Sequence, residues 1–351
     1  MLSADQVRAT VTAIAAEQSA DGALPWSRGE RLDPWDSVEA AMALDVGGEH
    51  RRAAAAYRWL AARQRPDGSW AGEYRAGAES SPAAESNHAG YLAVGTWHTW
   101  LASADAGLVV ELWPAVRRGL DLVVRMQRAD GAVGWALRGD GRPDELALLT
   151  GNASLFQALR CGIALAALTG DPQPDWELAV TALGTALRER PEAFADRSRY
   201  SMDWYYPVLA GAVTGAEARA RLAAGWARFV VPGLGVRCVG DQPWVTGAET
   251  CELALALVAA GRREDARGQL AAMQHLRHDD GSYWTGLVVA DGVRWPVERT
   301  TWTAAAVVLA ADAIAGVGPA AGLFADPAAL PAAGLPAGPA GTPAGTGMIG
   351  G

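Results

Sequence analysis

The sequence predicts an all-α fold, an (α/α)6 toroid of six helical hairpins and twelve helices. Amphipathic helical runs alternate with more apolar ones, as expected when an outer ring of helices covers an inner ring that is buried on both sides. A Gln–Asp–Gly–Trp signature recurs at the ends of amphipathic runs, and long loops alternate with short turns. We expect a single toroid domain over residues 1–315 and a Pro/Ala/Gly-rich flexible tail over 316–351.

The helical segments follow from the period of the apolar residues. The predicted amphipathic helices span 5–18, 50–64, 108–127, 176–188, 217–229 and 263–274. The predicted apolar helices span 34–44, 86–101, 151–168, 204–213, 245–260 and 300–314. Turns from an apolar helix to the next amphipathic helix are short, whereas the return connections are long. Alternating connections of a toroid lie at opposite ends, so one end carries the long loops, where we expect the functional site.

The clearest copy of the repeated signature runs from Gln64 through Gly68 to Trp70. Looser copies start at Gln18, Gln127 and Gln274. Each Asp-Gly pair can end a helix, because glycine adopts the left-handed conformation at low cost. Each Gln can bond carbonyls left unpaired in the last helical turn. The spacing of the helical pairs falls in the range typical of repeat architectures, so we interpret the signature as part of the scaffold.

Bulk composition excludes several classes of function. The net charge of −9 argues against a nucleic-acid partner, which would require a basic surface. The chain contains no Lys, which excludes lysine-bound pyridoxal phosphate and Schiff-base chemistry. Its three Cys lack the spacing of a disulfide framework, and no apolar run is long enough for a membrane span. We therefore predict a soluble, cytoplasmic protein with a small-molecule substrate and no cofactor.

Residues Trp59, Leu60, Gln64, Gly68 and Trp70 match the aromatic–aliphatic–x3–Gln–x3–Gly–x–Trp pattern of squalene and oxidosqualene cyclases. The chain thus resembles the terpenoid cyclases and protein prenyltransferase β-subunits, and in particular the small single-toroid actinobacterial proteins labelled prenyltransferase-like. The resemblance covers about residues 5–315. It implies an α/α toroid around a central apolar cavity in which an isoprenoid or another small molecule reacts.

The chemical motifs of those families are mostly missing. The Asp-x-Asp-Asp tetrad of the cyclases is absent, and its nearest counterparts are the segment from Asp33 to Asp36 and the Asp279-Asp280 pair. The prenyltransferases hold zinc with an Asp-x-Cys pair and a later His. Here Cys238, Asp241 and Cys251 have the wrong spacing for those ligands. We predict no metal site.

The apolar helices begin with unusually polar residues, which would line one mouth of the toroid. Paired acids in such a pocket can shift each other's pKa and act as acid and base. The candidate catalytic residues are Asp36, Glu39, Asp203, Glu249 and Glu298. The candidate substrate-binding residues are Trp35, His88, Asn152, Arg160, Tyr205, Tyr206, Trp244, Trp284, Arg299 and Trp302.

Three functions remain open on these residues. The first, implied by the resemblance, is a prenyltransferase- or terpenoid-cyclase-like enzyme that acts on an isoprenoid or another small molecule by acid–base chemistry. The second is a six-hairpin carbohydrate-active enzyme, either a glycoside hydrolase or a sugar epimerase, that uses paired carboxylates. The third is a non-catalytic toroid that binds a ligand or a protein.

Overall fold

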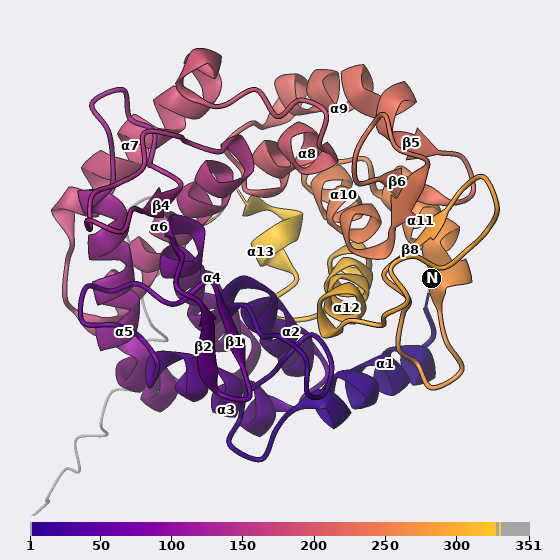
Figure 1. The fold of residues 1–351 in the computed structure, drawn as a ribbon, viewed down its shortest axis with the longest axis horizontal. Helices are drawn as coiled ribbons and strands as arrows, with labels where there is room; N and C mark the ends of the chain where they lie inside the picture. The colour runs from indigo at the N-terminus through magenta and orange to yellow at the C-terminus, as the bar shows by residue number, and fades with distance from the viewer. Residues whose placement is uncertain (1, 328–329, 331–351) are drawn as a thin grey trace, which may run out of the picture.

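The computed structural model describes residues 2–327 and 330 and has two concentric rings of helices (Figure 1). The outer ring is formed by α1 (Ala4–Glu17), α3 (His50–Ala61), α5 (Ala106–Arg125), α7 (Pro174–Glu189), α9 (Gly215–Phe229) and α11 (Arg263–Ala272). The inner ring is formed by α2 (Pro34–Val46), α4 (Ser86–Ser103), α6 (Leu149–Thr169), α8 (Ser201–Leu209), α10 (Gly247–Ala259) and α12 (Thr301–Ala315). The predicted (α/α)6 toroid is confirmed.

The two rings differ in how their helices are buried. Every residue of α2 from Pro34 to Asp45 is buried, whereas the adjacent outer helix α3 buries mainly one stripe that includes Tyr57 and Leu60. This is the difference expected between a helix covered on all sides and a helix with one face in solvent. Although the inner helices are apolar, none in the described part of the chain is long and apolar enough to cross a membrane.

Three of the repeated glutamines, Gln18, Gln64 and Gln127, connect neighbouring hairpins. The Gln64 amide donates to the carbonyl of Gly68 in its own turn (3.1 Å) and to that of Ala115 in α5 (2.9 Å). Gln127 repeats this arrangement with Gly131 and with Ala179 of α7. Gly68 has φ +96°, and a Cβ there would lie 2.2 Å from the Arg118 carbonyl oxygen. The signature therefore stabilises the ring, and its glycine is required both by φ and by the close approach of the next outer helix.

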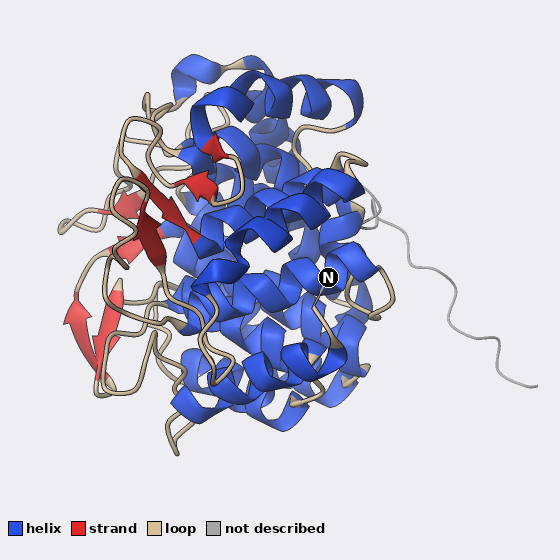
Figure 2. Ribbon diagram, turned by 90° about the vertical axis from the view of Figure 1, so that its right-hand side faces the viewer, coloured by secondary structure: helices blue, strands red, loops and turns tan. Residues whose placement is uncertain are grey.

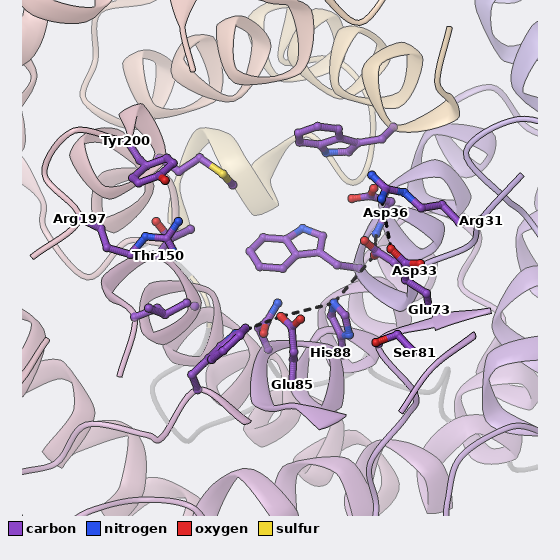
Figure 3. A pocket seen from close by; sticks show the side chains of 18 of the residues that line it. Arg31, Asp33, Asp36, Glu73, Ser81, Glu85, His88, Thr150, Arg197 and Tyr200 are labelled. Carbon is purple, nitrogen blue, oxygen red and sulfur yellow. Dashed lines mark hydrogen bonds and ion pairs between the residues drawn. The ribbon is translucent and has the colours of Figure 1, made fainter. Parts of the chain in front are cut away.

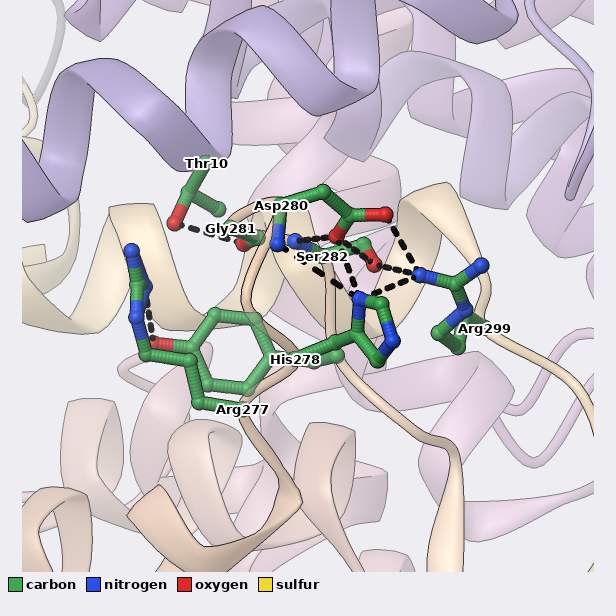
Figure 4. Close-up of polar contacts among 8 residues, drawn as sticks. Thr10, Arg277, His278, Asp280, Gly281, Ser282 and Arg299 are labelled. Atoms are coloured by element: carbon green, nitrogen blue, oxygen red, sulfur yellow. Dashed lines mark hydrogen bonds and ion pairs between the residues drawn. The ribbon is translucent and has the colours of Figure 1, made fainter.

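The first and last hairpins meet to close the ring. Helix α12 packs against both α1 and α2. The Thr10 hydroxyl of α1 donates to the carbonyl of Gly281 (2.9 Å), which belongs to the last copy of the signature (Figure 4). The backbone N–H of Thr301 donates to the Trp26 carbonyl (2.8 Å). These bonds join segments from opposite ends of the domain sequence.

The long loops lie together at one end of the toroid and carry short strands that the sequence did not predict (Figure 2). The strands are β1 (Glu73–Arg75), β2 (Ala78–Ser81), β3 (Ala84–Glu85), β4 (Ala136–Leu137), β5 (Val230–Val231), β6 (Gly235–Arg237), β7 (Trp244–Thr246) and β8 (Gly286–Val288). Two 3-10 turns, η1 (Pro191–Ala193) and η2 (Met273–Leu276), accompany them. Strands β5 to β8 form an antiparallel sheet. Strand pairing gives the backbone groups of these loops hydrogen-bond partners and fixes the loops above the inner helices.

The prediction of a flexible tail from residue 316 is wrong for its first part. Residues Gly322–Ala325 form a short helix, α13, which packs against α10 and α12 and lies in the middle of the ring (Figure 1). Leu323 and Phe324 are 2% and 3% exposed. These apolar side chains fill the interior of the ring at the end opposite the long loops, and burial of their area stabilises the segment. Residues 328–329 and 331–351 of the predicted tail lie outside the described residues.

Candidate active site

A cavity of about 470 Å³ opens at the end of the toroid that carries the long loops (Figure 3). We call it the central pocket. Its lining combines carboxyl groups with indole rings, in residues contributed mainly by the starts of inner helices and the loops before them. The carboxyl groups are those of Asp33, Asp36, Glu73, Glu85 and Asp203, and the indoles are those of Trp26, Trp35, Trp135 and Trp302. The predicted site residues Asp36, Asp203, Trp35, His88 and Trp302 are thus brought together.

The start of α2 places two carboxyl groups at the pocket. Asp33 is the N-cap of α2, and its side chain accepts a hydrogen bond from the backbone N–H of Asp36 (2.9 Å). Pro34 at the first helical position fixes the backbone for this turn. The helix therefore directs Trp35 and Asp36 into the pocket. Sequence reasoning noted Asp33 only as part of an incomplete motif and missed it as a site residue.

His88 lies between two carboxyl groups. Its Nε2 is 4.0 Å from Asp33 Oδ1 and 4.0 Å from Glu85 Oε2, so these two oxygens are at most about 8 Å apart. Glu85 also accepts a hydrogen bond from the Trp135 indole (3.2 Å). His88 Nδ1 is buried and lacks a hydrogen-bond partner among the described residues. This imidazole can therefore position the two acids or bond a ligand in the pocket.

Burial and neighbouring acids raise the pKa of Asp36 well above its usual value. Loss of hydration is the largest cause, and the charges of Asp33 and Glu39 add to it. The Trp26 indole N–H near Asp36 opposes the shift, although it has no hydrogen-bond partner among the described residues. This shift favours the protonated form of Asp36, which is the form that a general acid needs.

Glu39 lies one turn below Asp36 and holds two aromatic side chains. It accepts hydrogen bonds from the Trp35 indole (2.7 Å) and the Tyr91 hydroxyl (2.9 Å). Burial raises the pKa of Glu39 to about 7, against the effect of these hydrogen bonds. Trp35 also packs on Tyr91, with ring centroids 4.9 Å apart. Glu39 does not line the pocket itself. It acts on the pocket through Trp35, whose position its hydrogen bond fixes.

Asp203 occupies a different environment at the start of α8. Its Oδ1 accepts hydrogen bonds from the Thr150 hydroxyl (2.5 Å) and backbone N–H (3.2 Å). Burial raises the pKa of Asp203, while these bonds and the charges of Arg197 and Arg221 oppose the rise. Unlike Asp36, Asp203 has donors and cations that stabilise its ionised form. Figure 3 shows Thr150 and Arg197 on the opposite side of the pocket from Asp36.

Two further acids of α10 are buried at the centre of the ring. Burial and the charge of Glu39 raise the pKa of Glu252 well above its usual value. Its Oε2 accepts a hydrogen bond from Tyr205, and its Oε1 lacks a partner among the described residues. Glu249 likewise has one buried oxygen, Oε2, without a described partner. Such oxygens are suited to hold a water molecule or a ligand hydroxyl. Neither acid belongs to the pocket lining, and Glu252 was not among the predicted site residues.

Several predicted binding residues have structural partners away from the pocket. The Asn152 side chain bonds the backbone of Val133 on both its oxygen (2.7 Å) and its nitrogen (3.0 Å). Arg160 donates to the carbonyls of Pro327 and Leu330, and so fixes the segment that closes the ring. Tyr206 lies below Trp35, with ring centroids 5.5 Å apart. The Trp244 indole donates to the Trp295 carbonyl (2.6 Å).

Glu298, Trp284 and Arg299 line a separate cavity of about 540 Å³ at the seam of the ring. Arg299 donates to Asp280 (2.6 Å) and Ser282 (2.8 Å) and lies 2.9 Å from His278 Nδ1 (Figure 4). The three predicted residues are therefore not brought to the central pocket. Their positions follow from the last long loop, which folds toward α1.

Other pocket residues were missed because they lie outside the predicted apolar helices. They include Trp26, Glu73, Glu85, Arg197 and Tyr200. Glu85 is the residue immediately before α4, where a shift of one position in the predicted helix start would have found it. Within the described chain, no group of three or more His, Cys, Asp or Glu residues is arranged to hold a metal ion.

The fold is that of α/α toroid glycosidases, as comparison with solved structures indicates. A wild-type glycosidase is 16% identical, with a TM-score of 0.69 over 88% of this chain and 95% of its own. The GH63 mannosylglycerate hydrolase of Thermus thermophilus in complex with glucose is 14% identical, with a TM-score of 0.65 over 86% and 99%. At these identities the similarity concerns the fold alone.

Sequence similarity identifies the family. No family model matches the chain. The chain is 52% identical over 324 residues to the MMP endo-(1,4)-3-O-methyl-alpha-D-mannosidase of Mycolicibacterium hassiacum, which covers 92% of this chain and 90% of that protein. The chain belongs to the family of this mannosidase, and thus to a family of glycosidases.

These comparisons correct the main functional interpretation of the sequence. The resemblance to terpenoid cyclases and prenyltransferases is wrong as an assignment of family, and a prenyltransferase or other transferase function is wrong with it. The glutamine signature did not distinguish these families, because the glutamine bonds backbone carbonyls of its own turn and of the next hairpin. Any toroid of this kind presents such carbonyls. The carbohydrate-active alternative is the one that the relatives support.

Proposed function

We propose that the protein is an endo-acting glycoside hydrolase that cleaves α-(1→4) linkages between 3-O-methyl-D-mannose units. The observation that carries this proposal is the 52% identity to the Mycolicibacterium hassiacum enzyme over nearly the whole chain. The central pocket supports it, because indoles and carboxyl groups meet there. Indole faces suit the C–H surfaces and methyl ether of such a sugar, while carboxyl groups can bond its free hydroxyls.

In this proposal Asp36 is the general acid. Burial and the charges of neighbouring acids raise the pKa of its carboxyl group well above the usual range, which favours the protonated form. It then donates that proton to the glycosidic oxygen as the bond to the anomeric carbon breaks. Glycosidases pair such an acid with a second carboxylate that activates water or attacks the anomeric carbon.

Two carboxyl groups are candidates for the second role. Asp203 has hydrogen-bond donors in Thr150 and a nearby cation in Arg197, which favour its ionised form. Glu252 lies outside the lining of the central pocket and its pKa is raised, but its unpartnered oxygen can hold a water molecule and its charge interacts with that of Asp36. Separate substitutions of the two acids distinguish these assignments.

The test is hydrolysis of an α-(1→4)-linked 3-O-methyl-D-mannose oligosaccharide by the purified protein. The unmethylated α-(1→4)-linked mannose oligosaccharide is the control substrate. We expect internal cleavage of the methylated chain and a loss of about 100- to 10,000-fold in kcat for Asp36→Asn. Absence of cleavage, or release of single sugars from the chain end only, contradicts the proposal.

Rescue by azide separates the roles of the acids. A small anionic nucleophile can replace a missing base or nucleophile but not a missing acid when the leaving group is poor. We therefore expect azide to restore cleavage in either Asp203→Asn or Glu252→Gln, but not in Asp36→Asn. Rescue of Asp36→Asn alone would reverse the assignment of the acid.

A further inference from the structure

A third cavity, of about 660 Å³, lies beside the central pocket at the same end of the toroid. Its walls come from the ends of α7 and α9, the starts of α6 and α8, and the loop over 194–200. We call it the lateral cavity. Helices α7 and α9 are outer helices that end at the long loops, so the lateral cavity extends outward from the ring toward its rim.

Arg197 and Asp203 line both cavities. The Arg197 guanidinium lies over the Tyr200 ring, 4.3 Å from its centroid. Within the described chain it makes no hydrogen bond or ion pair, so its donors are available to a ligand that passes between the cavities. A half-buried guanidinium with free donors beside an aspartate is suited to bond the hydroxyl and ether oxygens of a sugar.

The floor of the lateral cavity is aromatic and rigid. Trp204 stacks on Phe229 with ring centroids 5.2 Å apart and an interplanar angle of 17°. The Trp204 indole donates to the Arg221 carbonyl (2.8 Å), and Arg221 donates back to the carbonyls of Trp204 (2.8 Å) and Asp203 (2.7 Å). Asp196 and Ser198 add polar groups to the lining. A preformed cavity that combines aromatic rings with charged and polar groups is suited to a small polar molecule.

We propose that the lateral cavity binds sugar units of the substrate chain beyond those held in the central pocket. The chain would pass over Asp203 and Arg197, with Arg197 as a residue that determines preference for long substrates. This inference rests on the proposed function, because it takes the same α-(1→4)-linked 3-O-methyl-D-mannose chain as ligand. The two side chains that line both cavities, Arg197 and Asp203, are what support this occupant over an unrelated molecule.

Two neighbouring alanines of α9 provide a matched test. Ala223 and Ala224 are both exposed, but only Ala224 lines the lateral cavity. Ala224→Trp should fill the cavity from its solvent side without disturbing the core, whereas Ala223→Trp adds the same ring outside it. We expect Ala224→Trp to lower kcat/KM about tenfold for the longest oligosaccharide of a length series, and to leave the shortest hydrolysed member unchanged. Ala223→Trp should match the wild type at every length.

Arg197→Ala is the second variant, with Arg219→Ala of the exposed face of α9 as its control. Because the Arg197 charge also favours the ionised form of Asp203, Arg197→Ala should lower activity at every substrate length. We expect an additional loss for long substrates, seen in KM more than in kcat. An equal loss of activity for all substrate lengths would overturn the proposed length preference. Unchanged activity on the longest substrate in both Ala224→Trp and Arg197→Ala would overturn it as well.

Binding separates failure of this inference from failure of the proposed function. Calorimetric titration of the same oligosaccharides into Asp36→Asn measures affinity without turnover. If wild-type protein cleaves no oligosaccharide, the proposed function fails, and the titration still decides the inference. If long chains bind more weakly when Ala224→Trp is added to Asp36→Asn, but not when Ala223→Trp is added, the result supports binding of the chain in the lateral cavity. Equal binding by both double variants, or no binding of any chain, overturns it.

Discussion

Replacement of Glu39 by Gln should remove a pH dependence of folding stability. Burial raises the pKa of this carboxyl group from 4.5 to about 7 in the folded protein. Protonation of an acid whose pKa is raised by folding stabilises the folded state. This stabilisation is complete below the unfolded pKa and is lost as pH rises from about 4.5 to about 7. At 1.36 kcal/mol per pKa unit, the wild type loses about 3 kcal/mol of unfolding free energy over this range.

Gln is a close match in shape, and its Oε1 can still accept hydrogen bonds from Trp35 and Tyr91. Urea titration measures the free energy of unfolding at each pH. From about pH 4.5 to pH 8, this free energy should therefore fall by about 3 kcal/mol less for Glu39→Gln than for the wild type. Tyr91→Phe removes a donor that favours the ionised form, so it should raise the Glu39 pKa further and extend the loss to higher pH. A Glu39→Gln curve parallel to that of the wild type would refute this reasoning.

Other substitutions test the scaffold by urea or thermal unfolding. Gln64→Ala removes one hydrogen bond to its own turn and one to the next hairpin and should cost about 1–3 kcal/mol; an unchanged melting temperature would argue against that role. Gly68→Ala should destabilise far more than Gly29→Ala, because both glycines have positive φ but only the first would meet a backbone carbonyl; equal effects would show that the clash is relieved. Phe324→Ala should cost about 3–5 kcal/mol if α13 fills the interior of the ring as its burial indicates. A cost below about 1 kcal/mol would contradict this.

The architecture was predictable because it depends on regular patterns. Alternation of apolar and amphipathic helices gave the number of hairpins, and the alternation of loop lengths gave the end that carries the long loops and the central pocket. The short helix α13 was missed because Leu323 and Phe324 stand in a stretch rich in Pro, Ala and Gly, where composition suggests a flexible chain. Their burial depends on contacts with α10 and α12, which are distant in sequence.

Part of the central pocket was predictable from polarity. Asp36 and Asp203 stand out because they lie at the starts of helices that are otherwise apolar, where burial of an acid is costly unless it is paired. Arg197 and Tyr200 lie in a loop without periodicity, and only the three-dimensional fold brings them opposite Asp36. Glu298 was misplaced for the same reason, because the path of a long loop is not encoded in local pattern.

The contrast between Gln64 and Asp36 explains why the sequence predicted the fold better than the chemistry. Gln64 bonds backbone carbonyls, which are present wherever two outer helices of such a toroid meet, so its signature follows the architecture through proteins of different function. The properties of Asp36 come from neighbouring side chains, in particular Asp33 and Glu39, together with burial. A match at Gln64 therefore supports an α/α toroid, whereas a reaction has to be argued from the acids that face the pocket.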